Sequence, residues 1–254
     1  MQYRRRLAWV WLLVLALCAM WPDANERAAT EPSLPSILSP PSAAHWIGTD
    51  DRGRDVAWRL LAGARPVVIV AIVAAAAYIV VGVVFGIAGG LWRIFGLFAD
   101  RVIELGLVLP AVYLLLAVRA FFGPPSALLI GLALGFVYGP HAARLCRAET
   151  ERVLSSAHVD AARATGVPTH RLFWVHVLPT AIRPALALAT LALGQAALFE
   201  GALGAIGLGL APPAATWGEL LQQAAAQPRA WWLWMGPTVA IVASVLATRN
   251  PHRG

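Results

Sequence analysis

Residues 66–92 read PVVIVAIVAAAAYIVVGVVFGIAGGLW and contain no Asp, Glu, Lys or Arg. About 20 consecutive apolar residues let a helix cross the hydrocarbon core of a bilayer, so this stretch is long enough to span a membrane. In lipid every backbone polar group must be paired inside the protein, and a helix achieves this within one segment. The stretch therefore predicts a helical membrane protein.

Other apolar segments extend this prediction along the chain. They cover residues 7–21, 102–122, 124–145, 182–206 and 231–248. We expect an all-α polytopic membrane protein with about six transmembrane helices. The first segment follows Arg4, Arg5 and Arg6 and is typical of either a cleaved signal peptide or a retained anchor helix. No A-x-A cleavage site follows it directly, so we expect residues 1–21 to be an anchor.

Composition excludes several classes of function. The chain has 254 residues, of which 59% are hydrophobic and only 13% are charged, outside the usual range of a soluble domain. All 20 basic residues are arginine, so the chain has no lysine for a G-x-x-x-x-G-K phosphate loop and cannot bind ATP by that route. The arginines form no stripe with stacking aromatics, which argues against nucleic acid. We expect no enzyme activity, cofactor, metal or disulfide.

Arginine asymmetry predicts the orientation. With the N-terminus in the cytoplasm, thirteen arginines are cytoplasmic and six lie outside, and Arg119 falls near an outer helix end. The chain then divides into the anchor (1–21), an extracytoplasmic segment (22–65), a transmembrane domain (66–248) and a short cytoplasmic tail (249–254). Both termini are expected in the cytoplasm.

A polar segment over residues 146–182 is long for a simple connection. It predicts one helix from Ala148 to Thr165, ended by Gly166 with Pro168 just beyond, and a second helix over residues 169–176. Ala161 and Ala162 give the first helix a small, flat face that another protein can approach closely. The segment therefore suits insertion into a partner's groove.

Three separated motifs resemble those of the permease subunits of ATP-binding cassette importers, and they follow one another along the chain in the order found in that family. The first motif is the cytoplasmic EAA coupling loop, about residues 146–180, which here has Asp160, Ala161, Ala162, Gly166, His176, Leu178 and Pro179. The second is HWIGTDDRGRDV at residues 45–56, with Gly48, Thr49, Asp50, Gly53, Arg54 and Asp55, and the third comprises Leu208, Gly209, Pro212, Pro213, Thr216, Trp217 and Gly218. The second and third resemble the dipeptide, oligopeptide and nickel branch of these binding-protein-dependent inner membrane components.

The resemblance implies a channel-forming subunit of type I importer architecture in the inner (cytoplasmic) membrane. A homologous second permease would complete the pathway as a heterodimer, and ATP-binding cassette subunits would dock on the EAA loop. An extracytoplasmic solute-binding protein would deliver the cargo. Peptides are the expected cargo, while nickel or another small solute is the alternative. A membrane-embedded enzyme and a non-transporting scaffold are the rivals from other classes.

Two further features allow a plain and a functional interpretation. Glu200 lies inside an apolar segment, where a charge is costly, so it is either a polar group of the transport pathway or a buried polar contact. His45, Asp50, Asp51 and Asp55 have one histidine among interspersed arginines and lack the spacing of metal ligands. A salt-bridged structural turn is the better interpretation of that group.

Overall fold

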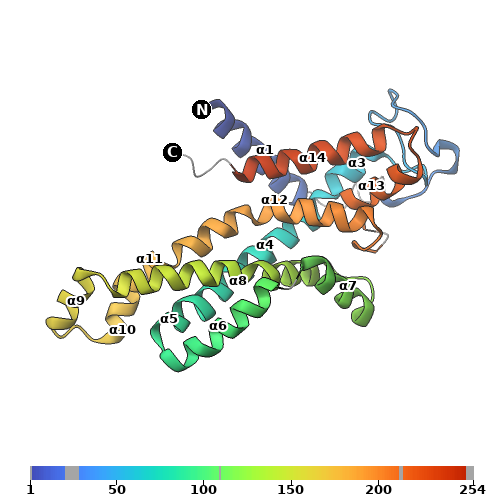
Figure 1. The fold of residues 1–254 in the computed structure, drawn as a ribbon. Coiled ribbons are helices and arrows are strands. Elements are labelled where there is room, and N and C mark those ends of the chain that lie inside the picture. The colour runs from blue at the N-terminus through green and yellow to red at the C-terminus, as the bar shows by residue number, and fades with distance from the viewer. Residues whose placement is uncertain (1, 21–28, 109, 212–213, 250–254) are drawn as a thin grey trace. The chain divides into compact units, whose positions relative to one another are not determined.

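The computed structural model describes residues 2–20, 29–108, 110–211 and 214–249. The described chain is helical, with a single isolated bridge between Thr49 and Asp55 as its extended pairing (Figure 1). Its elements, in chain order, are α1 Gln2–Met20, η2 Leu34–Ser36, α3 Val56–Ala62, α4 Ala64–Val81, η3 Gly82–Ala88, α5 Gly89–Leu91, α6 Arg93–Val108, α7 Ala111–Phe122, α8 Ala127–Leu154, α9 Ala157–Ala164, α10 Thr169–Leu172, η4 Phe173–Val177, α11 Leu178–Ala181, α12 Arg183–Ala205, α13 Trp217–Ala226 and α14 Trp232–Arg249.

Three helices are long and apolar enough to cross a membrane, namely Val56–Leu91, Ala127–Leu154 and His170–Ala205. The pair Arg93–Val108 and Val112–Phe122 passes the same test together but is bent by 92°. The last apolar helix, Trp232–Thr248, is shorter. The described residues therefore give three spanning helices, or four if the bent pair is one span, and six spans remain a prediction.

The apolar segment predicted over residues 102–122 is not one straight helix. The chain bends sharply between α6 and α7, and a new helix starts where the backbone N–H of Tyr113 donates to the carbonyl of Pro110. Pro110 has no N–H and its ring clashes with the preceding helical turn, so a regular helix cannot continue through it. One apolar segment thereby becomes two helices.

The elbow helices also differ from the expectation. The predicted helix from Ala148 to Thr165 is divided, because α8 runs on to Leu154 and α9 begins only after Ser156. Ser156 leaves the helical region at φ −85° and ψ 144°, and its hydroxyl donates to the carbonyl of Val153. Serine hydroxyls compete in this way with the backbone hydrogen bonds of a helix. The pattern of small and apolar residues gives no sign of such a break.

The fifth apolar segment, predicted over residues 182–206, corresponds to α12 at Arg183–Ala205. A single helix runs from His170 to Ala205, so the second elbow helix continues directly into that segment. The π turn η4 precedes Pro179, which lacks the N–H that an α-helix needs, and accommodates it without ending the helix. The returning arm of the elbow is thus joined to the apolar helix with no loop between them.

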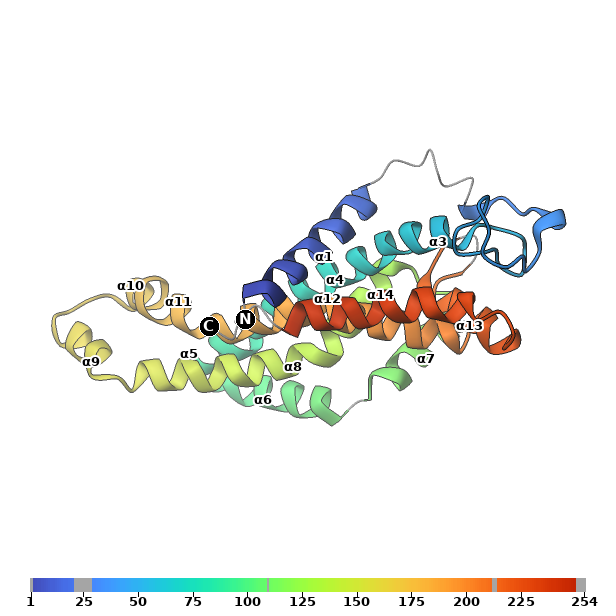
Figure 2. The same cartoon turned by 90° about the horizontal axis from the view of Figure 1, so that it is seen from above.

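The chain forms two compact units, each built from separate stretches of sequence. The first unit comprises Met1–Ile72, Leu116–Gly131 and Leu191–Gly254. In it α1 packs against α14, where the Trp11 indole donates to the Ser244 hydroxyl over 3.1 Å. Its core joins Val67, Ala197, Trp217 and Ile241 from four helices. The N- and C-terminal helices are therefore part of one packed core (Figure 2).

The second unit comprises Val73–Leu115 and Leu132–Thr190 and is packed through small residues. A Cβ added to Gly86 would lie 2.5 Å from the carbonyl oxygen of Ala143, so η3 and α8 approach too closely for any side chain there. Arg147 on α8 pairs with Asp100 on α6 at 3.2 Å and holds the α5–α6 hairpin against that helix. The unit presents the elbow at one end of α8 (Figure 1).

Candidate functional sites

The elbow of the second unit is an exposed polar turn between α8 and the helix that begins at His170. Asp160, Ala161 and Gly166 are exposed, and Ala162 is half-buried. Asp160 has only a long 3.8 Å ion pair with Arg163 on the same helix. Neighbouring residues do not cover the small face of α9, which leaves it accessible to another protein.

Gly166 ends α9 as predicted. The Val167 N–H donates to the Ala162 carbonyl over 3.1 Å, and the Gly166 N–H donates to the Arg163 carbonyl over 3.0 Å. This is the Schellman arrangement, which needs a left-handed residue after the helix, and Gly166 has φ +77°. A Cβ at Gly166 would meet nothing within 4 Å, so backbone conformation alone requires glycine here.

Two contacts fix α9 against the returning chain. Val159 is fully buried, and the rings of His158 and His176 lie with centroids 5.8 Å apart. His176 belongs to η4, so its ring joins the two arms of the elbow. Leu178 and Pro179 follow on α11, half-buried and exposed respectively, and continue the same returning arm.

The first unit holds the second motif, a tight turn built on two left-handed glycines. Gly48 and Gly53 have φ +77° and +74°, and a Cβ on Gly53 would lie 1.9 Å from the carbonyl oxygen of Ser33. Asp55 caps α3 by accepting from the Ala57 N–H over 2.8 Å, and its other oxygen pairs with His45 at 2.9 Å. The turn therefore presents its carboxylates in a fixed geometry.

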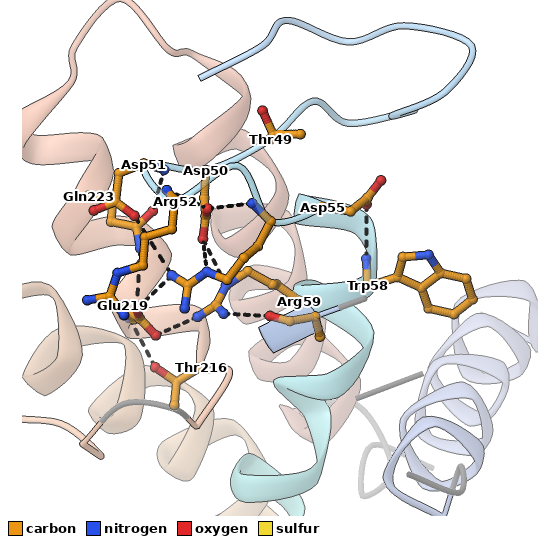
Figure 3. Close-up of polar contacts among 12 residues, drawn as sticks. Thr49, Asp50, Asp51, Arg52, Asp55, Trp58, Arg59, Thr216, Glu219 and Gln223 are labelled. Carbon is orange, nitrogen blue, oxygen red and sulfur yellow. Dashed lines mark hydrogen bonds and ion pairs between the residues drawn. The ribbon is translucent and has the colours of Figure 1, made fainter. Parts of the chain in front are cut away.

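Behind this turn lies a buried cluster of four charges, which we call the ion cluster: Asp50, Arg54, Arg59 and Glu219 (Figure 3). Asp50 accepts from the Arg54 Nε over 2.7 Å and lies 3.4 Å from the Arg59 Nε. Glu219 binds both arginines, with 3.1 Å to Arg54. The side chains of Asp50, Arg54 and Arg59 are at most 1% exposed.

The ion cluster connects three separate parts of the chain. Arg59 at the start of the apolar helix also donates to the Ala29 carbonyl over 2.8 Å, and Glu219 is the third residue of α13. The Thr216 hydroxyl caps α13 by accepting from the Glu219 N–H over 3.0 Å. Because charges this deep need several partners each, the cluster fixes α13 to the turn at residues 48–55.

Asp51 lies beside the ion cluster, but its side chain is 41% exposed. Partial burial raises the pKa of the Asp51 carboxyl, and the neighbouring negative charge of Asp50 raises it further. The nearest cation, Arg54, is 3.8 Å away and already bound to two other carboxylates. The two adjacent aspartates thus have opposite environments, one fully paired and one poorly compensated.

Glu200 lies on α12 and is fully buried. The Thr216 hydroxyl and the Gly218 backbone are near its carboxyl, yet neither oxygen has a hydrogen bond of ordinary geometry to a described residue. The crossing of α12 and the start of α13 covers it, where a Cβ on Gly204 would lie 2.4 Å from the Gly218 Cα. Burying a carboxyl at this depth is costly unless it is hydrogen-bonded, and the Thr216 hydroxyl and Gly218 backbone are the groups placed to bond it.

One protein family matches most of this chain. Residues 82–249, more than half of the chain, match the model of the family described as binding-protein-dependent transport system inner membrane component. The chain belongs to this family. It is thus an inner membrane component of a transport system that depends on a binding protein.

Curated relatives match most of this inner membrane component. The dipeptide transport system permease protein DppC of Escherichia coli (strain K12) is 35% identical, over 93% of this chain and 80% of the relative. The di/tripeptide permease protein DppC of Pseudomonas aeruginosa is 33% identical, over 94% and 81%. The dipeptide permease protein DppC of Alkalihalophilus pseudofirmus is 32% identical, over 82% and 68%.

Sequence reasoning found part of the sites of this inner membrane component. It predicted the turn with Gly48, Thr49, Asp50, Gly53, Arg54 and Asp55, and the structure brings these residues together as a salt-bridged turn. It missed Arg59 and Glu219 as members of the ion cluster. The sequence does contain one signal for the position of Glu219, because Thr216 and Glu219 have the T-x-x-E spacing of a capping box at the start of a helix. Pro212 and Pro213 of the third motif lie outside the described residues.

Proposed function

We propose that this chain is the channel-forming permease subunit of an ATP-driven peptide importer. The observation that carries the proposal is the elbow: an exposed small-residue helix, closed by Gly166, leads into one continuous helix from His170 to Ala205. A force applied to α9 by a partner therefore reaches the helix that begins at His170 through one short turn at Gly166. Such a connection suits alternating access driven from outside the chain.

The proposed partners are the subunits that would bind the exposed elbow and complete the transport system. ATP-binding cassette subunits dock on Asp160, Ala161, Ala162 and Gly166, with the returning arm at His176, Leu178 and Pro179 completing the contact. A homologous second permease supplies the other half of the pathway, and an external binding protein delivers the cargo. Both termini lie in the cytoplasm, and ATP is bound and hydrolysed by the partner subunits.

Peptides are the proposed cargo because the relatives named above are dipeptide and di/tripeptide permeases. Nickel or another small solute is the alternative within the same branch. Glu200 is proposed to face the pathway once α13 moves, since its carboxyl has no described partner in the present arrangement. Replacing Glu200 with glutamine should then reduce uptake while leaving assembly intact, and unchanged uptake would remove this role.

The test is reconstitution with the partner subunits in proteoliposomes. We expect uptake of a labelled dipeptide that requires ATP, the binding protein and both permeases. A cysteine at Ala161 should cross-link to the ATPase subunit, whereas a cysteine at the exposed Ala44 of the first unit should not. ATP-driven uptake of Ni²⁺ without dipeptide uptake would favour the alternative cargo. Turnover of a substrate by the chain alone would favour an enzyme, and assembly without any uptake would favour a scaffold.

A further inference from the structure

A cavity of about 410 Å³ lies within the first unit. Its walls come from α1, the α3–α4 region, α14 and the segment before α3, and they include Val14, Leu15, Cys18, Trp46, Met235 and Val239. No charged side chain and no hydroxyl group lines it among the described residues. The volume falls within the range of small-molecule sites, but the chemistry suits a purely apolar ligand.

The indole groups of the cavity divide into two kinds. Trp11 and Trp217 have protein partners, because their Nε1 atoms donate to the Ser244 hydroxyl over 3.1 Å and to the Leu60 carbonyl over 2.9 Å. Trp46 and Trp231 are 81% and 47% exposed, and neither indole donates to another residue of the described chain. The cavity therefore has an apolar wall and two unused N–H donors in exposed positions.

Exposed apolar side chains flank the cavity on both α1 and α14. On α1 the neighbours Leu13 and Leu17 are 59% and 55% exposed, and on α14 Val242 and Leu246 are 50% and 54% exposed. Exposed tryptophan is typical of the level where hydrocarbon meets headgroups. A ligand can thus enter sideways from the bilayer with its polar end at the level of Trp46 and Trp231.

We infer that this cavity binds one acyl chain of a membrane phospholipid. The hydrocarbon fills the space between α1 and α14, and the indole N–H groups of Trp46 and Trp231 donate to the ester carbonyls at its head. A peptide does not fit, because its termini and backbone need polar partners that these walls do not offer. This lipid site is separate from the transport function proposed above and is tested without measuring uptake.

The test uses the assembled complex in lipid nanodiscs with a phosphatidylethanolamine that carries a diazirine on one acyl chain. Photolabelling should concentrate on Val14, Leu15, Met235 and Val239, which line the cavity, rather than on Leu13 and Val242, which do not. Substituting Val14→Trp or Val239→Trp displaces about two methylenes of the bound chain, which lowers labelling about tenfold. The controls Leu13→Trp and Val242→Trp, one on each helix, keep labelling within about twofold.

A second experiment tests whether the indole N–H groups bind the lipid head, and its ether-lipid control distinguishes lost binding from misfolding. The double variant Trp46→Phe with Trp231→Phe keeps the apolar surface, and it should lose labelling by the ester lipid while labelling by a diether analogue stays unchanged. Uniform labelling of cavity and control positions would overturn the proposal. So would a photoreactive residue at Val14 that forms adducts with the second permease instead of lipid.

Discussion

At the scale of single residues, the adjacent Asp50 and Asp51 show how position within one turn decides the role of a carboxylate. Asp50 has no exposed side-chain surface and accepts from the Arg52 and Arg54 backbone N–H groups, each over 2.9 Å, in addition to the Arg54 side chain. Asp51 is partly buried, and the attraction of Arg54 and Arg52 does not offset that burial and the charge of Asp50. The paired carboxylate of Asp50 therefore stabilises the folded state, whereas a negative charge on Asp51 slightly destabilises it.

The first prediction concerns Arg59. Replacing Arg59 with methionine leaves the buried carboxylates of Asp50 and Glu219 undercompensated and removes the hydrogen bond to the Ala29 carbonyl. Breaking a buried ion pair from one side costs about 3–5 kcal/mol, so thermal unfolding of the purified complex should occur at clearly lower temperature. Arg52→Gln is the control, because Arg52 is exposed. Equal melting temperatures for both variants would show that the ion cluster does not hold the fold.

The second prediction concerns pH. The pKa of Asp51 is raised above its ordinary 3.8, so the folded state disfavours the anion. Its contribution to stability is most favourable when Asp51 is protonated and is lost as pH rises through the raised pKa. Asp51→Asn should flatten that decline and leave stability at pH 7 equal or higher. Asp50→Asn should lower stability at the same pH, measured by thermal unfolding of the complex from about pH 3 to about pH 7, a window that begins below the ordinary aspartate pKa and extends above it.

At the scale of elements, backbone constraints decide where helices end and how closely they approach. Gly166 is needed for its positive φ, while Gly204 is needed for the space between α12 and α13. The two glycines therefore respond differently to the same substitution. Alanine strains the backbone at Gly166 but creates a steric clash at Gly204.

The third prediction compares two glycines with the same conformation. Gly166 and Gly123 both have φ +77° and open space around the missing Cβ. Alanine at either position should cost about 1 kcal/mol of backbone strain. Only Gly166→Ala changes the end of α9, so it alone should reduce ATPase stimulation and cross-linking through a cysteine at Ala161. Equal loss in Gly123→Ala would attribute the effect to general destabilisation.

The fourth prediction concerns the α12–α13 crossing. Gly204→Ala places a Cβ 2.4 Å from the Gly218 Cα, so the two elements must separate. Overpacking of this kind costs about 1–3 kcal/mol and should admit water to the buried Glu200. Hydrogen exchange of α13 should rise in this variant and not in Ala202→Val, a change at an exposed position of the same helix. Unchanged exchange in both would mean that the crossing tolerates a side chain.

The sequence predicted the apolar helices and the end of α9 well, because apolar length and a glycine after a helix are local signals. It could not predict the division at Ser156 or the continuity through Pro179, since each depends on which of two competing backbone arrangements the surroundings favour. It also missed Arg59 and Glu219, which are 160 residues apart. Tertiary packing decides which residues pair over such a distance. The only local sign in the sequence is the T-x-x-E spacing of Thr216 and Glu219.

At the scale of the whole molecule, helix length decides what projects from the bilayer. The helix His170–Ala205 has 36 residues and, at 1.5 Å per residue, is about 54 Å long. The hydrocarbon core of a bilayer is about 30 Å thick, so one end of this helix must project into water. The polar, exposed elbow is the end that water can accommodate.

The last prediction follows from that projection. A cysteine at Ala161 in the elbow should react with a membrane-impermeant maleimide only in inside-out vesicles, and a cysteine at Ala44 only in right-side-out cells. Ala161 and Ala44 are both exposed in the chain itself, so in vesicles stripped of the ATPase subunits their accessibility differs only through the membrane. The unsubstituted chain is the control, since Cys146 is buried and Cys18 partly so. Labelling of both positions from the same side would contradict the orientation and, with it, docking of an ATPase on the elbow.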